Sequence, residues 1–310
     1  MPSIITVTLN PAIDKSSTIP NLLPEKKLKC TPPVFEPGGG GINVARALKK
    51  LGAEATAIYL AGGYTGKFFT QLLNEEHIPS VVIDITAHTR ENLIILDTAA
   101  NQQYRFGMPG PVVAEQEWKR LLHALEEIND VDFIIASGSV PQGVPADIFA
   151  QIAAIAKKKN AKCIVDTNGE ALQHAVAEGL YLIKPNLGEL SALVRKEELQ
   201  NDMIAAAARE VIAKGNCEYV MVSMGAAGAM LVTGNTDRQI ITPPVIRRNT
   251  VGAGDSMVAG IVYSLSKGKT IWQAAQYGVA CGTAATMNPG TELCRAADAE
   301  KLYAMISAAG

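Results

Sequence analysis

The stretch "NTVGAGDSMVAG", from Asn249 to Gly260, places glycines and an acidic residue directly ahead of small apolar residues. Glycine is unfavourable inside a helix, so this pattern predicts a turn that leads into a helix. The N-terminus of a helix exposes unpaired amide groups and attracts anions. Asp255 therefore either caps the helix or accepts a proton beside a transferring phosphoryl group. The glycines on its N-terminal side favour the catalytic interpretation, because they let a phosphate approach the backbone closely.

Around this stretch, short β-rich runs alternate with helical patterns. The runs are nearly all apolar, which is typical of parallel strands covered on both faces. They span residues 4–9, 55–62, 132–138, 161–167, 180–186 and 219–225. The alternation predicts an α/β fold, a doubly wound and mainly parallel sheet flanked by helices, as one domain over residues 1–310.

Two segments, about 11–36 and 88–107, lack helical periodicity, and the first contains five prolines. We expect them to form one small antiparallel sheet that projects as a lid, and ordinary edge hairpins are the alternative. Apolar lid residues would leave an exposed patch on a monomer, which predicts a homodimer through the lid. These residues are Leu22, Leu28, Val34, Leu93 and Ile95.

Polar residues follow several predicted strands, in "SGSVP", "DTNGE", "KPNLGE" and "SMGAAG". Ligands of open α/β sheets bind at the carboxyl ends of the strands, so these ends are candidates for a site. Glu189 lies three residues after Asn186, which suits either a hydrated Mg²⁺ or a helix cap. A second glycine-rich junction, "EPGGGGINVARALKKLG" from Glu36 to Gly52, suits a phosphorylated or polyhydroxyl ligand.

Composition and motif spacing exclude several other functions. The chain has 310 residues and a net charge of -2, which gives no reason to expect nucleic acid or a membrane as partner. Its five cysteines are widely spaced, and no apolar run is long enough for a signal peptide or membrane helix, so we expect a cytoplasmic protein. Neither a P-loop nor a strict dinucleotide fingerprint is present.

"GGGGINVARALKKLG" and "NTVGAGDSMVAGIV" match two family signatures in both spacing and composition. Over essentially its whole length, the chain resembles the ribokinase-like (PfkB-type) carbohydrate kinase family. "QYRFGMPG" and "SGSVPQGV" are most similar to its bacterial 6-phosphofructokinase branch, which lacks a P-loop. The resemblance implies a ribokinase-like fold and transfer of the ATP γ-phosphoryl group to fructose 6-phosphate, with Mg²⁺ and K⁺ as cofactors.

The resemblance also implies a role for each matching residue. Asp255 is the expected catalytic base, with an anion hole formed by Gly252, Ala253 and Gly254. The expected sugar-phosphate residues are Asp14, Lys27 (from a neighbouring subunit), Gly39, Gly40, Asn43, Arg90 and Ser139. The expected ATP residues are Lys184, Asn186, Ser223, Gly225 and Gly228. Glu189 is expected to organise Mg²⁺, and a K⁺ site is expected at Asn249, Val251, Ala285, Asn288 and Gly290.

Three positions depart from patterns in this family. Lys29 stands where the 6-phosphofructokinase branch has arginine, and Glu292 replaces an arginine beside the K⁺ loop, which puts K⁺ dependence in doubt. Kinases of fructose 1-phosphate or tagatose 6-phosphate usually have lysine where this chain has Gly40, which favours fructose 6-phosphate. Tagatose-6-phosphate kinase and 1-phosphofructokinase remain alternatives, as does a non-catalytic sugar-phosphate sensor. An intact Asp255 favours an enzyme over a sensor.

Overall fold

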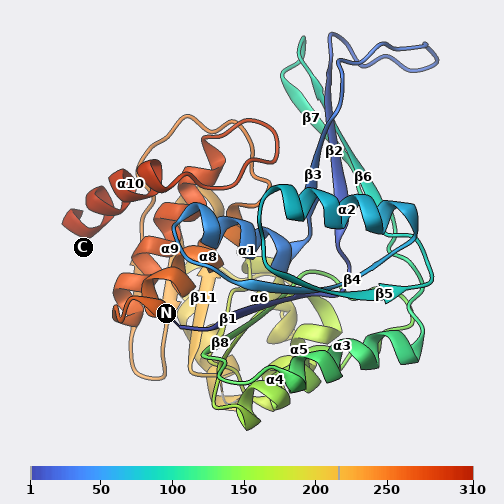
Figure 1. Ribbon diagram of the computed structural model, residues 1–310. Coiled ribbons are helices and arrows are strands. Elements are labelled where there is room, and N and C mark those ends of the chain that lie inside the picture. Colours follow the sequence, from blue (N-terminus) through green and yellow to red (C-terminus); the bar gives the residue numbers. More distant parts are fainter. Residues whose placement is uncertain (1, 216, 310) are drawn as a thin grey trace.

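The computed structural model describes residues 2–215 and 217–309. Within these ranges the strands form two sheets, one of nine strands and one of four. The large sheet is sandwiched between two layers of helices, and the small sheet stands out from it as an arm (Figure 1). The doubly wound α/β fold predicted from the sequence is confirmed.

The large sheet has the strand order β13-β12-β11-β10-β9-β8-β1-β4-β5. The strands from β11 to β5 pair in parallel, whereas β11–β12 and β12–β13, at one edge, pair antiparallel. Between β8 and β4, the chain order reverses across β1, which creates a switch point where a crevice opens at the carboxyl ends. The strands are β1 (Ile4–Thr8), β4 (Thr56–Gly62), β5 (Ser80–Ile85), β8 (Phe133–Ser137), β9 (Lys162–Asp166), β10 (Leu182–Ile183), β11 (Tyr219–Ser223), β12 (Ala229–Val232) and β13 (Asp237–Ile240).

Each face of the large sheet is covered by its own helices and has its own apolar core. One face carries α1 (Gly40–Lys50), α2 (Gly63–Glu75), α8 (Ala253–Ser266), α9 (Ile271–Thr286) and α10 (Ala296–Ala309). The other carries α3 (Glu115–Glu127), α4 (Ile148–Lys158), α5 (Gly169–Glu178), α6 (Leu187–Leu193) and α7 (Ile204–Gly215). Burial from both sides explains why the strand runs are apolar at nearly every position.

The lid is built from β2 (Ala12–Ile19), β3 (Val34–Gly38), β6 (Arg90–Asp97) and β7 (Gln102–Phe106). Its two outer pairs are antiparallel as expected, whereas the central pair, β2 with β6, is parallel. The lid is therefore a mixed sheet, because its two halves come from segments that leave the large sheet in the same direction. It projects away from the domain, and residues 20–33 form its far end (Figure 1).

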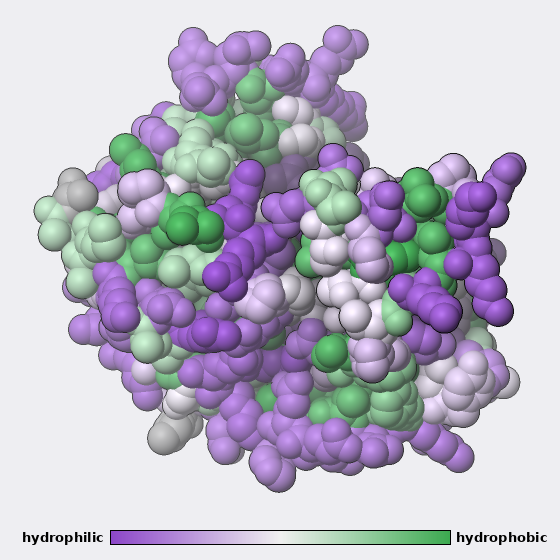
Figure 2. Space-filling model, turned by 90° about the horizontal axis from the view of Figure 1, so that it is seen from above, coloured by the Kyte–Doolittle hydropathy of each residue, from purple (hydrophilic) through white to green (hydrophobic). Residues whose placement is uncertain are grey.

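Large apolar side chains are exposed on the lid. Apolar patches interrupt the polar surface on the face seen from above (Figure 2). The exposed lid residues include Leu23, Val34, Tyr104 and Phe106. Of the residues expected in this patch, Val34 is exposed, Leu22, Leu28 and Leu93 are half-buried, and Ile95 is buried.

Within residues 2–215 and 217–309, the helices are too short or too polar to cross a bilayer.

Candidate active site

The polar strand ends predicted from the sequence meet at one edge of the large sheet. Parallel pairing brings the carboxyl ends of β1, β8, β9, β10 and β11 side by side. The first turn of α8 reaches the same edge, because a side chain at Gly254 would lie 3.2 Å from Lys184 Nζ. The crevice at this edge is therefore the candidate active site.

The N-terminus of α8 has the expected glycine junction, but the helix begins before Gly254 instead of after it. Gly252 is the N-cap in the left-handed region (φ 69°), and the helix begins at Ala253. A side chain at Gly252 would also lie 2.5 Å from Leu293. Gly254 belongs to the first helical turn instead of the preceding loop. The free amides of this turn face an approaching anion without a covering side chain.

Asp255, in the same turn, lies in an environment suited to a base. Its Oδ2 accepts a hydrogen bond from Asn43 Nδ2 at 2.9 Å. Burial, together with the negative charge of Asp166, raises the pKa of Asp255 to about 6, although Asn43 and Lys184 act to lower it. A carboxylate with this pKa is ionised at neutral pH and still basic enough to accept a proton from a bound hydroxyl.

Lys184 is a buried cation of the crevice. Its Nζ lies 3.3 Å from Asp166 Oδ1, and the side chain is 8% exposed. Burial acts to lower the pKa of Lys184, but Asp166 and Asp255 outweigh this and raise it, so the ammonium stays charged. It lies beside Gly254, where a positive charge can meet the phosphates of a nucleotide.

On the lid side, Asp14 of β2 accepts a hydrogen bond from Asn92 Nδ2 at 2.8 Å. The two residues are register partners across the parallel β2–β6 pair. Burial raises the pKa of Asp14 above its ordinary value, although the hydrogen bond from Asn92 acts to lower it. Arg90 is oriented by the carbonyl groups of Asn10 (3.0 Å) and Met108 (3.1 Å), and its buried Nε has no hydrogen-bond partner among residues 2–215 and 217–309. Nη1 and Nη2 each donate only one of these two bonds, so each keeps an N–H group that can bind an anionic ligand.

The glycine-rich junction ahead of α1 lies against the end of β8. Gly39 has a φ of 114°, and a side chain at Gly40 would lie 2.1 Å from Ser137 Oγ. Ser139 is held by Asn10, whose Nδ2 donates to its Oγ at 3.0 Å. Only glycine fits this junction without displacing Ser137, so backbone amides line this part of the crevice.

A cavity of about 620 Å³ opens beside the first turn of α8. Ser223, Gly225 and Gly228, three of the predicted nucleotide residues, line it together with Ala253 and Gly254. Pro243, Pro244, Val245 and Met257 supply apolar lining, which suits a planar nucleobase. Lys184 and Asn186 are not among its lining residues, although Asn186 is bridged to Ser223 at its rim.

Asn186 and Glu189 form a reciprocal cap on α6. Asn186 Oδ1 accepts from the Glu189 amide at 2.9 Å, and Glu189 Oε2 accepts from the Asn186 amide at 2.8 Å. The capping alternative thus describes the observed geometry. The cap uses only Oε2 of Glu189. Oε1 can therefore still accept a hydrogen bond from a water of a hydrated cation.

Of the residues predicted for K⁺, Ala285 lies in the last turn of α9, and the other four lie in the loops before α8 and after α9. Asn249 donates through its Nδ2 to the Asn288 carbonyl, and its Oδ1 accepts from the Val251 amide at 2.7 Å. The Ala285 carbonyl accepts from the Asn288 amide at 3.2 Å, and Gly290 has a φ of 64°. Backbone carbonyls and an Asn oxygen are hard oxygen donors, which fits an alkali cation.

The structure adds two findings to the roles predicted from the sequence. Asp166, in the polar strand end "DTNGE", is the last residue of β9 and pairs with Lys184. Asn92 orients Asp14, but it had no signal, because its contact depends on the parallel register of β2 and β6. Lys27 is exposed in the segment at the far end of the lid, consistent with a role that requires a second subunit.

Comparison with known proteins places this geometry in a family context. Residues 5–298 match the family described as pfkB family carbohydrate kinase. ATP-dependent 6-phosphofructokinase isozyme 2 of Escherichia coli (strain K12) is 44% identical over 99% of this chain and 100% of its own. 1-Phosphofructokinase of Bacillus subtilis (strain 168) is 31% identical, covering 93% and 95% of the two chains.

Solved structures of phosphofructokinase-2 from Escherichia coli have a fold similar to that of this chain over nearly its whole length. The complex with potassium has a TM-score of 0.95 at 44% identity, and the complex with fructose-6-phosphate has 0.93 at 42%. Each covers 99% of this chain and 100% of the other.

Proposed function

The chain belongs to the pfkB family of carbohydrate kinases, and we propose that it transfers the γ-phosphoryl group of ATP to the 1-hydroxyl of fructose 6-phosphate. The products are ADP and fructose 1,6-bisphosphate. The observation that carries this proposal is Asp255, a carboxylate with a pKa of about 6 beside the unobstructed amides of a helix N-terminus. Phosphoryl transfer requires an oriented base and preorganised positive charge at one place.

In the proposed reaction, Asp255 accepts the proton of the 1-hydroxyl while the hydroxyl oxygen forms a bond to the γ-phosphorus. The bond between that phosphorus and the bridging oxygen of ADP breaks. Asn43 fixes the orientation of the Asp255 carboxylate. The amides of Gly252, Ala253 and Gly254 stabilise the negative charge on the transferring group.

The acceptor is held from the lid and the glycine-rich junction. Asp14 is placed to bind sugar hydroxyls, because Asn92 occupies only one of its oxygens. The amides of Gly39 and Gly40 and the side chain of Ser139 complete this part of the site. The 6-phosphate is bound by Arg90 together with Lys27 of a second subunit.

On the donor side, Ser223, Gly225 and Gly228 bind the nucleotide in the cavity, and Lys184 with Asn186 binds its phosphates. Mg²⁺ would supply neutralising charge between the phosphate oxygens, with Glu189 holding it through water. Within the described ranges no three acidic, His or Cys side chains form a ready metal cage, which agrees with a cation held mainly by phosphate and water.

K⁺ is proposed where the end of α9 meets two loops, at Asn249, Val251, Ala285, Asn288 and Gly290. A similar protein has been solved with potassium, which supports this assignment. Glu292 does not oppose it, because its carboxylate is already bound to Arg295 at 2.8 Å and lies 3.8 Å from Lys50.

We also propose that the enzyme acts as a homodimer through the lid and works in the cytoplasm, where ATP and sugar phosphates are available. The exposed apolar side chains of the lid support the dimer. A monomer would expose them to water, whereas an isologous contact would bury them and bring Lys27 to the partner's site.

A coupled ADP-release assay with fructose 6-phosphate, tagatose 6-phosphate and fructose 1-phosphate tests the function. We expect the highest kcat/KM with fructose 6-phosphate. Preference for fructose 1-phosphate or tagatose 6-phosphate would replace the proposed substrate by one of the two alternatives. Tight binding of a sugar phosphate without any turnover would instead support a sensor.

A further inference from the structure

We propose that Glu36 is a positioning residue that couples the loop after α9, residues 287–294, to the sugar-phosphate site. The inference rests on the function proposed above and adds a residue for which that function has no role. Glu36 lies in β3, directly opposite Asp14 in the register of the lid. It also lies two residues before the glycine-rich junction that leads into α1.

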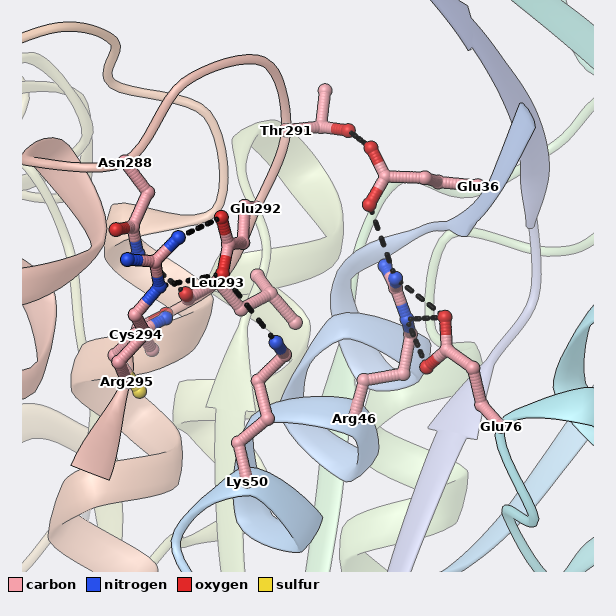
Figure 3. A network of polar contacts seen from close by, with 11 residues as sticks. Glu36, Arg46, Lys50, Glu76, Asn288, Thr291, Glu292, Leu293, Cys294 and Arg295 are labelled. Atoms are coloured by element: carbon pink, nitrogen blue, oxygen red, sulfur yellow. Dashed lines mark hydrogen bonds and ion pairs between the residues drawn. The ribbon is translucent and has the colours of Figure 1, made fainter. Parts of the chain in front are cut away.

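The two oxygens of Glu36 have different partners (Figure 3). Oε1 lies 3.3 Å from Nη2 of Arg46, and Oε2 accepts a hydrogen bond from the hydroxyl of Thr291. Arg46 comes from α1 and Thr291 from the loop after α9. One carboxylate on a lid strand thus connects two parts of the main domain.

Arg46 is a fixed point in this network. Its side chain is 5% exposed, and it donates to Glu76 from Nη2 at 2.6 Å and from Nε at 2.8 Å, and to the Pro37 carbonyl at 2.8 Å. Burial acts to lower its pKa, but Glu76 and Glu36 raise it, so the guanidinium remains charged. A buried charge with this many bonds does not move easily. The position of Glu36 therefore responds mainly to its other partner, Thr291.

The strand that Glu36 holds has little room to shift. A side chain at Gly38 would lie 2.3 Å from Asp14 Oδ2, so the backbone of β3 is packed directly on that carboxylate. A displacement of β3 by a few tenths of an ångström changes both the position of Asp14 and the direction of the Gly39 and Gly40 amides. Both belong to the acceptor site. The nucleotide cavity has none of these residues in its lining.

The other end of the network reaches the phosphoryl-transfer side. Thr291 is buried and follows Asn288, whose carbonyl accepts from Asn249. Asn249 in turn holds the Val251 amide, one residue before the N-cap of α8. The loop is therefore bonded to the segment leading into the anion hole and, through Glu36, to the strand packed on Asp14. Its conformation can set the distance between acceptor and donor sites.

The decisive variants are Thr291→Val, which removes the hydroxyl at nearly constant shape, and Thr291→Ser, which retains it. Binding of fructose 6-phosphate without ATP is measured by calorimetry at fixed KCl, together with KM for both substrates. We expect Thr291→Val to weaken sugar-phosphate binding by roughly 10-fold, since it breaks a bond to a charged group, and to change the KM for ATP less than about 2-fold. Thr291→Ser should restore binding.

Glu76→Gln is the matched control, because it weakens the hold on Arg46 without touching Thr291. It should lower the Tm but leave sugar-phosphate binding within about 2-fold of wild type. Wild-type affinity in Thr291→Val, equal losses for both substrates, failure of Thr291→Ser to restore binding, or an equal loss in Glu76→Gln would each overturn the proposal. If the wild type binds fructose 1-phosphate or tagatose 6-phosphate instead, the proposed substrate fails, and the same variants test the coupling with that ligand.

Discussion

Two carboxylates in the crevice each accept a hydrogen bond from an asparagine, but they belong to different regions. Asp255 is held by Asn43 at 2.9 Å, and both residues lie in helices of the main domain. Asp14 is held by Asn92 at 2.8 Å, and both lie in strands of the lid. The helical pair rests on a buried core, whereas the lid pair rests on a small sheet with exposed apolar side chains. We infer that the Asp255–Asn43 pair acts in phosphoryl transfer with groups from its own chain. The Asp14–Asn92 pair binds the sugar phosphate with help from a second subunit.

The sharpest test of the helical pair is Asp255→Asn. This variant retains the shape of the side chain but removes the base. We expect kcat to fall by roughly 10²–10⁴-fold while fructose 6-phosphate still binds. Steady-state kinetics and calorimetric binding measure the two effects separately. Turnover near the wild-type value would show that Asp255 is not the base.

The lid pair is tested by separating the subunits with Phe106→Asp. Phe106 is 44% exposed on β7, so a charge there should prevent the lids from packing without disturbing the core. We expect a folded monomer that has lost most of its activity, as measured by light scattering and by the coupled assay. Met305→Asp is the control, since Met305 is 55% exposed on α10, away from the lid. A fully active Phe106→Asp monomer would remove the roles given to the shared lid and to Lys27.

The difference between the regions also explains what the sequence predicted. The glycine junction and Asp255 are contiguous along the chain, so their geometry follows from local helix physics. Asp14 was recognised through the family resemblance. Asn92 was missed because the lid was expected to be antiparallel. Asn92 lies opposite Asp14 only in the parallel register of β2 and β6 that the structure shows.

Glu189 and Glu36 mark two further limits. The spacing of Asn186 and Glu189 is the same for a cap and for a hydrated cation, and the structure contains the cap. Glu36 had no signal, because its partner Thr291 lies far away in sequence and meets it only after the lid strand packs on the last loop. Long-range pairs of this kind depend on tertiary packing and leave no periodicity in the chain.

A third prediction concerns the phosphate contact of the lid. Arg90→Ala removes a guanidinium that makes two hydrogen bonds, both to backbone carbonyls, within the part of the chain that the structure describes. We expect the KM for fructose 6-phosphate to rise by roughly 10- to 100-fold, as for a lost bond to a charged group. The KM for ATP should stay within about 2-fold of wild type, because the ATP site lies in the main domain. Equal changes in both KM values would place Arg90 outside the acceptor site.

The smallest expected effect compares the two asparagines directly through pH. Asp255 must be ionised to act as a base, and burial raises its pKa to about 6, so kcat/KM should fall as the pH drops through about 6. The bond from Asn43 lowers this pKa, so Asn43→Ala should raise it and move the acid limb of the profile to higher pH. Asn92→Ala breaks the corresponding bond to Asp14 and should raise the KM for fructose 6-phosphate, leaving the limb near pH 6. Profiles of kcat/KM from pH 5 to 8, with protein stability checked at each pH, decide whether Asp255 or Asp14 is the titrating base. A limb that moves with Asn92→Ala and not with Asn43→Ala would assign the titrating base to the lid and reverse the roles of the two carboxylates.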